Sequence, residues 1–247
     1  MISPQKSGIM KKHVICIFLA LVLPLWLAAP VNAEQSCQDL LGVDFFSDLV
    51  FFGESTTTHL RQRSPLAPTQ IWANSSGTAR LDSNLAYRPV VDPQSGKSVP
   101  LAELAKQKQP CCIVLSFGLN GITSFSTNVE DYLQKYQKLM DDILQVSPNT
   151  HFLIQSIYPV AEANLQQNWG FNATPTQINE KINHLNQSLK SYCLHLKNAD
   201  FIDTSCNLKD GDGFLRAEYT TDGIHLTKAA YQVILKEIAS KRKDQKT

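Results

Sequence analysis

The feature that most constrains the fold is an alternation of short apolar runs with longer stretches of helical periodicity. The runs expected to form strands are 49–52, 69–73, 113–117, 152–157 and 201–202. Apolar residues recur at helical spacing over 129–146 and 178–196, and a last helix is expected over 228–240. Strands that alternate with helices pair in parallel, because each helix carries the chain back along the sheet. The pattern therefore predicts an α/β fold, a three-layer α/β/α sandwich around a central, mostly parallel sheet.

Two of the expected helices are preceded by capping signals. Thr127 and Glu130 have the spacing of a capping box, in which each residue can satisfy a free backbone N–H of the other. Thr174 and Gln177 have the same spacing, and Pro175 between them suits the first helical turn. These signals predict where the two helices begin.

Two long segments, 80–99 and 161–174, lack periodicity. The first carries Pro89, Pro93 and Gly96, which are typical of a surface loop with turns. Loops of this length in a compact domain often carry function. Both segments are therefore candidate walls of a substrate cleft.

The first 33 residues have the pattern of an export segment. Three lysines precede an uncharged apolar run at 14–29, and small residues at 31–33 provide a cleavage site. We expect a signal peptide at 1–33. The alternative is an uncleaved membrane anchor, because the apolar stretch is about long enough to span a bilayer, although Pro24 and Asn32 weaken that interpretation.

Both interpretations carry the remaining residues, 34–247, across the membrane as a single domain. The expected location is secreted or periplasmic, with a membrane tether if the N-terminal segment is retained. Without the three lysines of that segment, 20 basic residues face 22 acidic ones. The short basic tail at 241–243 is better suited to keeping a helix end soluble than to binding a polyanion. No nucleic-acid partner is therefore expected.

The cysteines suggest one disulfide and no metal site. Cys16 falls in the export segment, which leaves Cys37, Cys111, Cys112, Cys193 and Cys206. An odd number cannot all pair within one chain. Cys193 and Cys206 bracket a short helix-to-strand segment and are the preferred pair, whereas Cys111 and Cys112 begin an apolar run and are expected to be buried. No C-x-x-C pair or Cys/His spacing indicates a metal, so neither metal nor cofactor is expected.

Three polar stretches carry residues suited to acyl chemistry. Ser55 follows the first apolar run, and a serine hydroxyl becomes a good nucleophile only when a base takes its proton. Asn120 follows the third run, where its amide can donate to a developing oxyanion. Asp222 lies three residues before His225, so its carboxylate can hold one ring nitrogen and leave the other as a base. Parallel strands deliver their following loops to one edge of the sheet, where we expect these residues to meet.

Each stretch also has a purely structural interpretation. Ser55 alone fits a polar residue that caps a helix, Asn120 before Gly121 fits an ordinary turn, and the segment 222–225 fits a surface turn. His59 lies four residues after Ser55, where a packing or rim position is favoured over a second base.

The order of these stretches resembles the SGNH branch of the GDSL-type esterases and lipases. That family has G-D-S after its first strand, G-x-N-D in a later block and D-x-x-H near the C-terminus. This chain has Gly-Glu-Ser at 53–55, Gly-Leu-Asn-Gly at 118–121 and Asp-Gly-Ile-His at 222–225. The resemblance covers about residues 45–240 and implies the flavodoxin-like SGNH hydrolase fold.

The resemblance implies a role for each matched residue. Ser55 corresponds to the nucleophile, His225 to the general base and Asp222 to the carboxylate that orients it. The side-chain amide of Asn120 corresponds to an oxyanion donor. The backbone N–H groups of Ser55 and Gly77 complete the implied oxyanion hole.

Two residues depart from the family pattern. Glu54 stands where the family has the aspartate of G-D-S, and Gly121 stands where it usually has the aspartate of G-x-N-D. Both are supporting positions. We therefore expect these departures to alter the bracing of the loops more than the reaction.

Together these residues predict an exported serine esterase that hydrolyses carboxylic esters, with small acyl groups on carbohydrate as the preferred substrates. One alternative is an O-acyltransferase that uses the same triad and passes the acyl group to a glycan hydroxyl. Another is a catalytically silent carbohydrate-binding protein of the same fold, which Glu54 and Gly121 favour and the intact triad disfavours. The expected partner is a small-molecule or glycan ester, and the sequence leaves the oligomeric state open.

Overall fold

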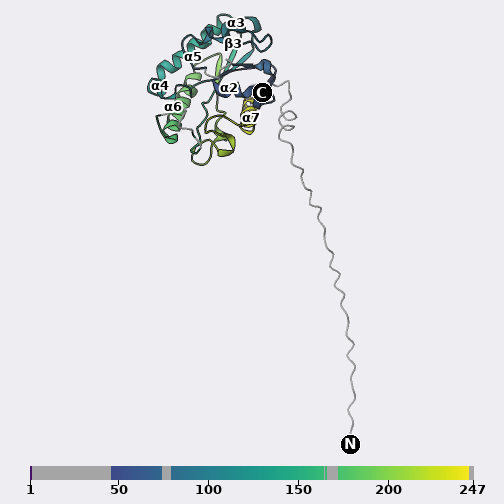
Figure 1. Cartoon of the computed structure of the whole chain (residues 1–247), viewed down its shortest axis with the longest axis vertical. Coiled ribbons are helices and arrows are strands. Elements are labelled where there is room, and N and C mark those ends of the chain that lie inside the picture. Colours follow the sequence, from purple (N-terminus) through teal and green to yellow (C-terminus); the bar gives the residue numbers. More distant parts are fainter. Residues whose placement is uncertain (2–45, 74–78, 164, 166–171, 245–247) are drawn as a thin grey trace. The chain divides into compact units, whose positions relative to one another are not determined.

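A parallel five-stranded sheet forms the centre of the protein (Figure 1). The computed structural model describes residues 1, 46–73, 79–163, 165 and 172–244. In these ranges the strand order is β2-β1-β5-β6-β7, and every neighbouring pair is parallel. The strands are β1 (Leu49–Gly53), β2 (Ile71–Trp72), β5 (Cys112–Ser116), β6 (His151–Gln155) and β7 (Ala199–Ile202). The predicted parallel sheet is confirmed.

Helices cover both faces of this sheet. They are α2 (Ser55–Arg63), α3 (Leu101–Lys108), α4 (Ile122–Thr127), α5 (Val129–Leu144), α6 (Pro175–Cys193) and α7 (Lys228–Asp244). Along β5, Ile113 and Leu115 enter one apolar core and Val114 enters the other, because successive strand residues face opposite sides. Helices α3 to α6 complete the first core, and α2 and α7 complete the second (Figure 1). This is the predicted three-layer α/β/α sandwich.

The start of α6 is confirmed, and the start of α5 needs a correction. Thr174 accepts the N–H of Gln177 at 3.3 Å, and the Gln177 side chain accepts the N–H of Thr174 at 2.9 Å. At α5 the cap is Asn128, whose side chain accepts the N–H three residues later at 3.1 Å. Thr127 is not a cap, because it ends α4 and its hydroxyl donates to the carbonyl of Ser124 at 2.8 Å.

The segment 80–99 is more ordered than predicted. It contains strand β3 (Pro89–Val91), which pairs in antiparallel fashion with β4 (Ser98–Pro100). Strands of three residues are too short for their periodicity to be visible in the sequence. Of the second predicted loop, 161–174, positions 164 and 166–171 lie outside the described residues.

The predicted disulfide between Cys193 and Cys206 is absent. Both thiols are free. Cys193 is buried in the core at the end of α6, and burial raises the pKa of its thiol to about 12. Cys206 is exposed, and its Sγ lies 3.8 Å from the carbonyl oxygen of Asp203. The helix therefore turns one sulfur inward while the loop after β7 leaves the other on the surface. Cys111 and Cys112 were both expected to be buried. Cys112 is buried, but Cys111 is exposed.

Of the predicted export segment at 1–33, residues 2–33 lie outside the described residues, and so does Cys37. Within the described ranges, none of the helices combines the length and the apolar character needed to cross a bilayer.

Candidate active site

The carboxyl ends of β1 and β5 lie side by side and position Ser55. These neighbouring strands are in register through Gly53 and Ser116, so the loops that follow them leave the sheet side by side. A Cβ atom at residue 53 would lie 2.5 Å from the Ser116 carbonyl oxygen and 2.3 Å from the Thr57 hydroxyl. Only glycine allows this approach. Ser55 then follows as the first residue of α2, close to the sheet edge.

A chain of hydrogen bonds joins Ser55, His225 and Asp222. The Ser55 Oγ lies 3.1 Å from His225 Nε2, and His225 Nδ1 lies 2.7 Å from Asp222 Oδ2. All three residues are half-buried. A serine hydroxyl in this arrangement can pass its proton to the imidazole, whose far nitrogen is held by a carboxylate. The three residues that sequence analysis grouped are therefore brought together.

The carboxylate of Asp222 is held by its own loop. Its Oδ1 accepts the N–H of Ile224 at 3.0 Å and the N–H of His225 at 2.8 Å, while Oδ2 faces the imidazole. Partial burial alone would raise the pKa of Asp222, but these hydrogen bonds outweigh it and hold the pKa below its ordinary value. Asp222 is thus maintained as an anion that can stabilise a protonated His225.

Thr220 closes the same loop from the other side. Its hydroxyl donates to the carbonyl of His225 at 2.9 Å and accepts the N–H of Gly223 at 3.0 Å. Gly223 has a φ of +89°, in the left-handed region that glycine adopts without strain. The tight turn fixes the acid and the base relative to each other before α7 begins.

Glu54 connects the serine loop to the asparagine loop. Its side chain is buried, and it accepts the N–H of Gly118 at 2.8 Å and the N–H of Asn120 at 3.1 Å. The loop is held further by Tyr132 and Tyr136, whose hydroxyls lie 2.9 Å and 3.1 Å from the same backbone carbonyl, that of residue 117. The residue that departs from the family pattern thus ties Ser55, its neighbour in sequence, to the position of Asn120.

The amide of Asn120 is oriented by one hydrogen bond. Its Nδ2 donates to the carbonyl oxygen of Ala79 at 2.9 Å. An amide nitrogen carries two N–H groups, so a second one is left for an oxyanion. Gly77, the other residue expected to donate, lies in 74–78, outside the described residues.

His59 packs against the proposed base without bonding to it. The two imidazole rings of His59 and His225 are 4.5 Å apart between centroids and tilted by 58°. The Nδ1 of His59 is buried and has no hydrogen-bond partner in the described part of the chain. Burial, and then the proximity of His225, lowers the pKa of His59. Its position is that of a packing residue, the interpretation favoured from the sequence.

Comparison with known proteins identifies the family. A sequence model of the GDSL-like Lipase/Acylhydrolase family matches residues 51–233, more than half of the 247 residues. The chain belongs to the GDSL-like lipase/acylhydrolase family. Membership in this family implies a hydrolase that acts on esters, and the matched range contains Ser55, Asn120, Asp222 and His225. A search of curated proteins gave no match for this family member.

Solved structures show the same fold. A protein from Streptococcus pneumonia, provisionally described as a platelet activating factor, is 20% identical with a TM-score of 0.58; the match covers 85% of this chain and 90% of that one. A provisionally assigned acylhydrolase from Bacteroides fragilis is 19% identical with a TM-score of 0.51, covering 87% of this GDSL-like family member and 95% of that chain. At these identities the likeness concerns the fold.

Glu54 is expected to make this GDSL-like family member less stable as the pH rises. Burial raises the pKa of Glu54 from its ordinary 4.5 to about 7, although backbone hydrogen bonds oppose the shift. Between these values the folded state holds a proton that the unfolded state has released. The resulting stabilisation is fully present below the unfolded pKa and is lost as the pH rises through the folded pKa, a difference on the order of 3 kcal/mol.

Urea unfolding at about pH 5 and about pH 8 measures this effect. The free energy of unfolding of the wild type should fall between the two pH values by more than that of Glu54→Gln. Glu103→Gln, at an exposed position in α3, should keep the wild-type difference. An identical pH dependence for wild type and Glu54→Gln would show that Glu54 titrates normally.

Proposed function

We propose that this protein is a serine esterase that hydrolyses carboxylic esters outside the cytoplasm. The observation that carries the proposal is the hydrogen-bonded chain from Ser55 through His225 to Asp222. It lies at the carboxyl edge of a parallel sheet, where folds of this kind place their ligands. The adjoining loop supplies Asn120, whose amide donates one N–H to Ala79 and keeps a second N–H without a partner among the described residues.

The proposed reaction begins with proton transfer. His225 Nε2 takes the proton of Ser55 as Oγ attacks the ester carbonyl carbon, and the carbonyl oxygen becomes an oxyanion. The oxyanion accepts hydrogen bonds from the Asn120 amide and from the backbone N–H groups of Ser55 and Gly77. As the oxyanion collapses, the bond between the carbonyl carbon and the alcohol oxygen breaks, and His225, stabilised by Asp222 while it is protonated, gives its proton to that oxygen. This step leaves the acyl group on Ser55.

Water completes the cycle. His225 takes a proton from the water molecule as its oxygen attacks the acyl carbon, and a second oxyanion forms in the same place. When it collapses, the bond to Ser55 Oγ breaks and the proton on His225 passes to that oxygen. The products are an alcohol and a carboxylic acid, and the residues return to their starting state.

The substrate class we favour is a small acyl group on carbohydrate. The support is the export segment expected at 1–33, which would bring the protein to a compartment where exported glycans are found. An O-acyltransferase would use the same residues and differ only in replacing water by a sugar hydroxyl. Incubation with an acyl donor and a glycan acceptor, followed by mass measurement of the glycan, separates the two: acylated glycan indicates transfer, and free carboxylic acid alone indicates hydrolysis.

Labelling with a fluorophosphonate tests the proposed nucleophile. Such a probe forms a bond between serine Oγ and phosphorus with loss of fluoride, and it reacts with serines that a base has activated. We expect wild type to be labelled, Ser55→Ala to remain unlabelled, and Ser188→Ala, a control in α6, to be labelled like wild type. An unlabelled wild type would instead favour the silent carbohydrate-binding alternative.

A further inference from the structure

Arg80 lies beside the loop that carries Asn120. Ala79 precedes Arg80, and its carbonyl oxygen accepts a hydrogen bond from the side-chain Nδ2 of Asn120 at 2.9 Å. The Arg80 side chain then reaches α4, where its Nη2 lies 3.3 Å from the Ser124 hydroxyl and its Cζ lies 5.2 Å from the centre of the Phe125 ring. The positive charge of Arg80 is therefore held against the first turn of α4. This helix begins two residues after Asn120.

The bare backbone of Gly121 provides the space for this charge. A Cβ atom at residue 121 would lie 2.7 Å from the Nε of Arg80 and 3.0 Å from its Cζ. Gly121 also has a φ of +117°, a conformation that side chains disfavour. Gly121 stands where the family pattern usually has an aspartate. The guanidinium of Arg80 packs against its backbone, in the space that the aspartate side chain would need.

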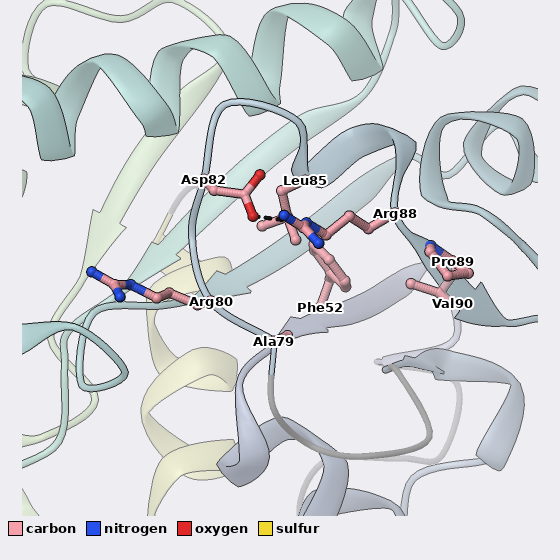
Figure 2. Close-up of a pocket in the computed structure, with 8 residues that line it drawn as sticks. All are labelled: Phe52, Ala79, Arg80, Asp82, Leu85, Arg88, Pro89 and Val90. Atoms are coloured by element: carbon pink, nitrogen blue, oxygen red, sulfur yellow. Dashed lines mark hydrogen bonds and ion pairs between the residues drawn. The ribbon is translucent and has the colours of Figure 1, made fainter. Parts of the chain in front are cut away.

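Arg80 has no carboxylate partner among the residues that the structure describes, whereas its neighbour Arg88 has one. Both arginines line a pocket of ≈ 290 Å³ (Figure 2). In it Arg88 Nε pairs with Asp82 at 2.7 Å, and Arg80 extends away from that pair. Burial sets the raised pKa of Glu54, and the Arg80 charge opposes it without forming an ion pair. Arg80 is an exposed residue, and its guanidinium has N–H donors beyond the one directed at Ser124.

We propose that Arg80 binds a negatively charged group, a carboxylate or a phosphate, carried by the ester substrate. The planar fork of a guanidinium donates two parallel hydrogen bonds to either group. This inference rests on the proposed esterase function, since the anion must belong to the ester that Ser55 attacks, and Arg80 follows Ala79, whose carbonyl holds the Asn120 amide. It adds a substrate preference that the triad alone does not determine.

Matched ester pairs test the preference. In the first pair, 4-nitrophenyl hemisuccinate carries a free carboxylate and its methyl ester carries none; in the second, acetylated glycerol phosphate is compared with acetylated glycerol. We expect wild type to prefer the charged member of at least one pair, which also identifies the anion. Arg80→Gln should lower kcat/KM for that member about tenfold, the smaller end of what a charge-assisted hydrogen bond contributes, because the side chain is exposed.

The controls separate binding of the anion from packing of the loop. The neutral ester should change by less than about twofold in Arg80→Gln, Arg80→Lys should retain part of the preference, and rising salt should weaken it in wild type. Arg216→Gln removes an exposed arginine elsewhere and should leave the preference intact. If Arg80→Gln slows the charged and neutral esters equally, Arg80 only braces the loop and the inference is wrong.

A binding measurement keeps this inference distinct from the proposed function. Calorimetric titration of Ser55→Ala with the two members of each pair requires no turnover. The charged member should bind about tenfold more tightly, and adding Arg80→Gln should abolish the difference. Absence of hydrolysis in wild type would count against the esterase, whereas equal binding of charged and neutral members would count against Arg80.

Discussion

Replacement of His225 by alanine is expected to lower kcat/KM for an ester roughly 10⁴-fold to 10⁶-fold, which is the range seen when a serine hydrolase loses its base. His225 Nε2 lies 3.1 Å from Ser55 Oγ, so its loss leaves a hydroxyl that no other described side chain can deprotonate at that distance. The rate of fluorophosphonate labelling should fall with it, because labelling requires the same activated oxygen. An unfolding temperature of the variant close to that of wild type would show that the variant is folded and that the loss is chemical.

His59→Ala is the matched control for this experiment. His59 packs on His225 at 4.5 Å between ring centroids but makes no hydrogen bond to Ser55. We expect its loss to reduce kcat/KM by less than about tenfold, through a less firmly packed His225 ring. Equal losses in the two variants would mean that the assignment of the base to His225 is wrong.

Replacement of Asn120 by alanine should lower kcat roughly 10²-fold to 10³-fold with little change in KM, the loss associated with one oxyanion donor. The structure explains why the amide is ready for this task. Ala79 accepts one of its N–H groups at 2.9 Å, and Glu54 accepts the backbone N–H of the same residue at 3.1 Å. A donor held in place before the substrate arrives stabilises the transition state without reorganising.

Asn128→Ala provides the control. This residue caps α5 a few positions later, and its side chain accepts one backbone N–H at 3.1 Å. Its loss should lower the free energy of unfolding by about 1 kcal/mol and leave kcat unchanged. Steady-state kinetics and urea unfolding, both measured for each variant, separate the loss of catalysis from the loss of stability. An Asn120→Ala protein with undiminished kcat would remove Asn120 from the proposed oxyanion hole.

The sheet and the long helices were predictable because their signals are local. The runs at 49–52, 113–117 and 152–157 each begin with at least three consecutive apolar residues, as a strand buried between two layers requires, and the stripe of α6 is preceded by the capping box of Thr174 and Gln177. The hairpin of β3 and β4 was missed because three-residue strands carry no periodicity. The cap of α5 was misplaced by one residue because Thr127 belongs to the end of α4, a helix too short to be recognised.

The meeting of Ser55, Asp222 and His225 was predictable for a different reason: each residue follows a recognisable strand or precedes a recognisable helix. The supporting contacts were not. The bonds from Glu54 to Gly118 and from Asn120 to Ala79 join residues 64 and 41 positions apart, and no local pattern encodes them. The absent disulfide has the same cause, because the inward turn of Cys193 depends on which face of α6 meets the sheet.

The distance of 170 positions along the chain between Ser55 and His225 has a consequence for synthesis. A ribosome completes β1 and the serine turn early, whereas the imidazole is added only after the last strand of the sheet has been made. On the proposed mechanism, a nascent or truncated chain that ends before 225 holds an ordinary, unreactive alcohol at position 55. The hydroxyl would acquire its reactivity only when the final loop docks, so we expect incomplete products to be inert toward esters.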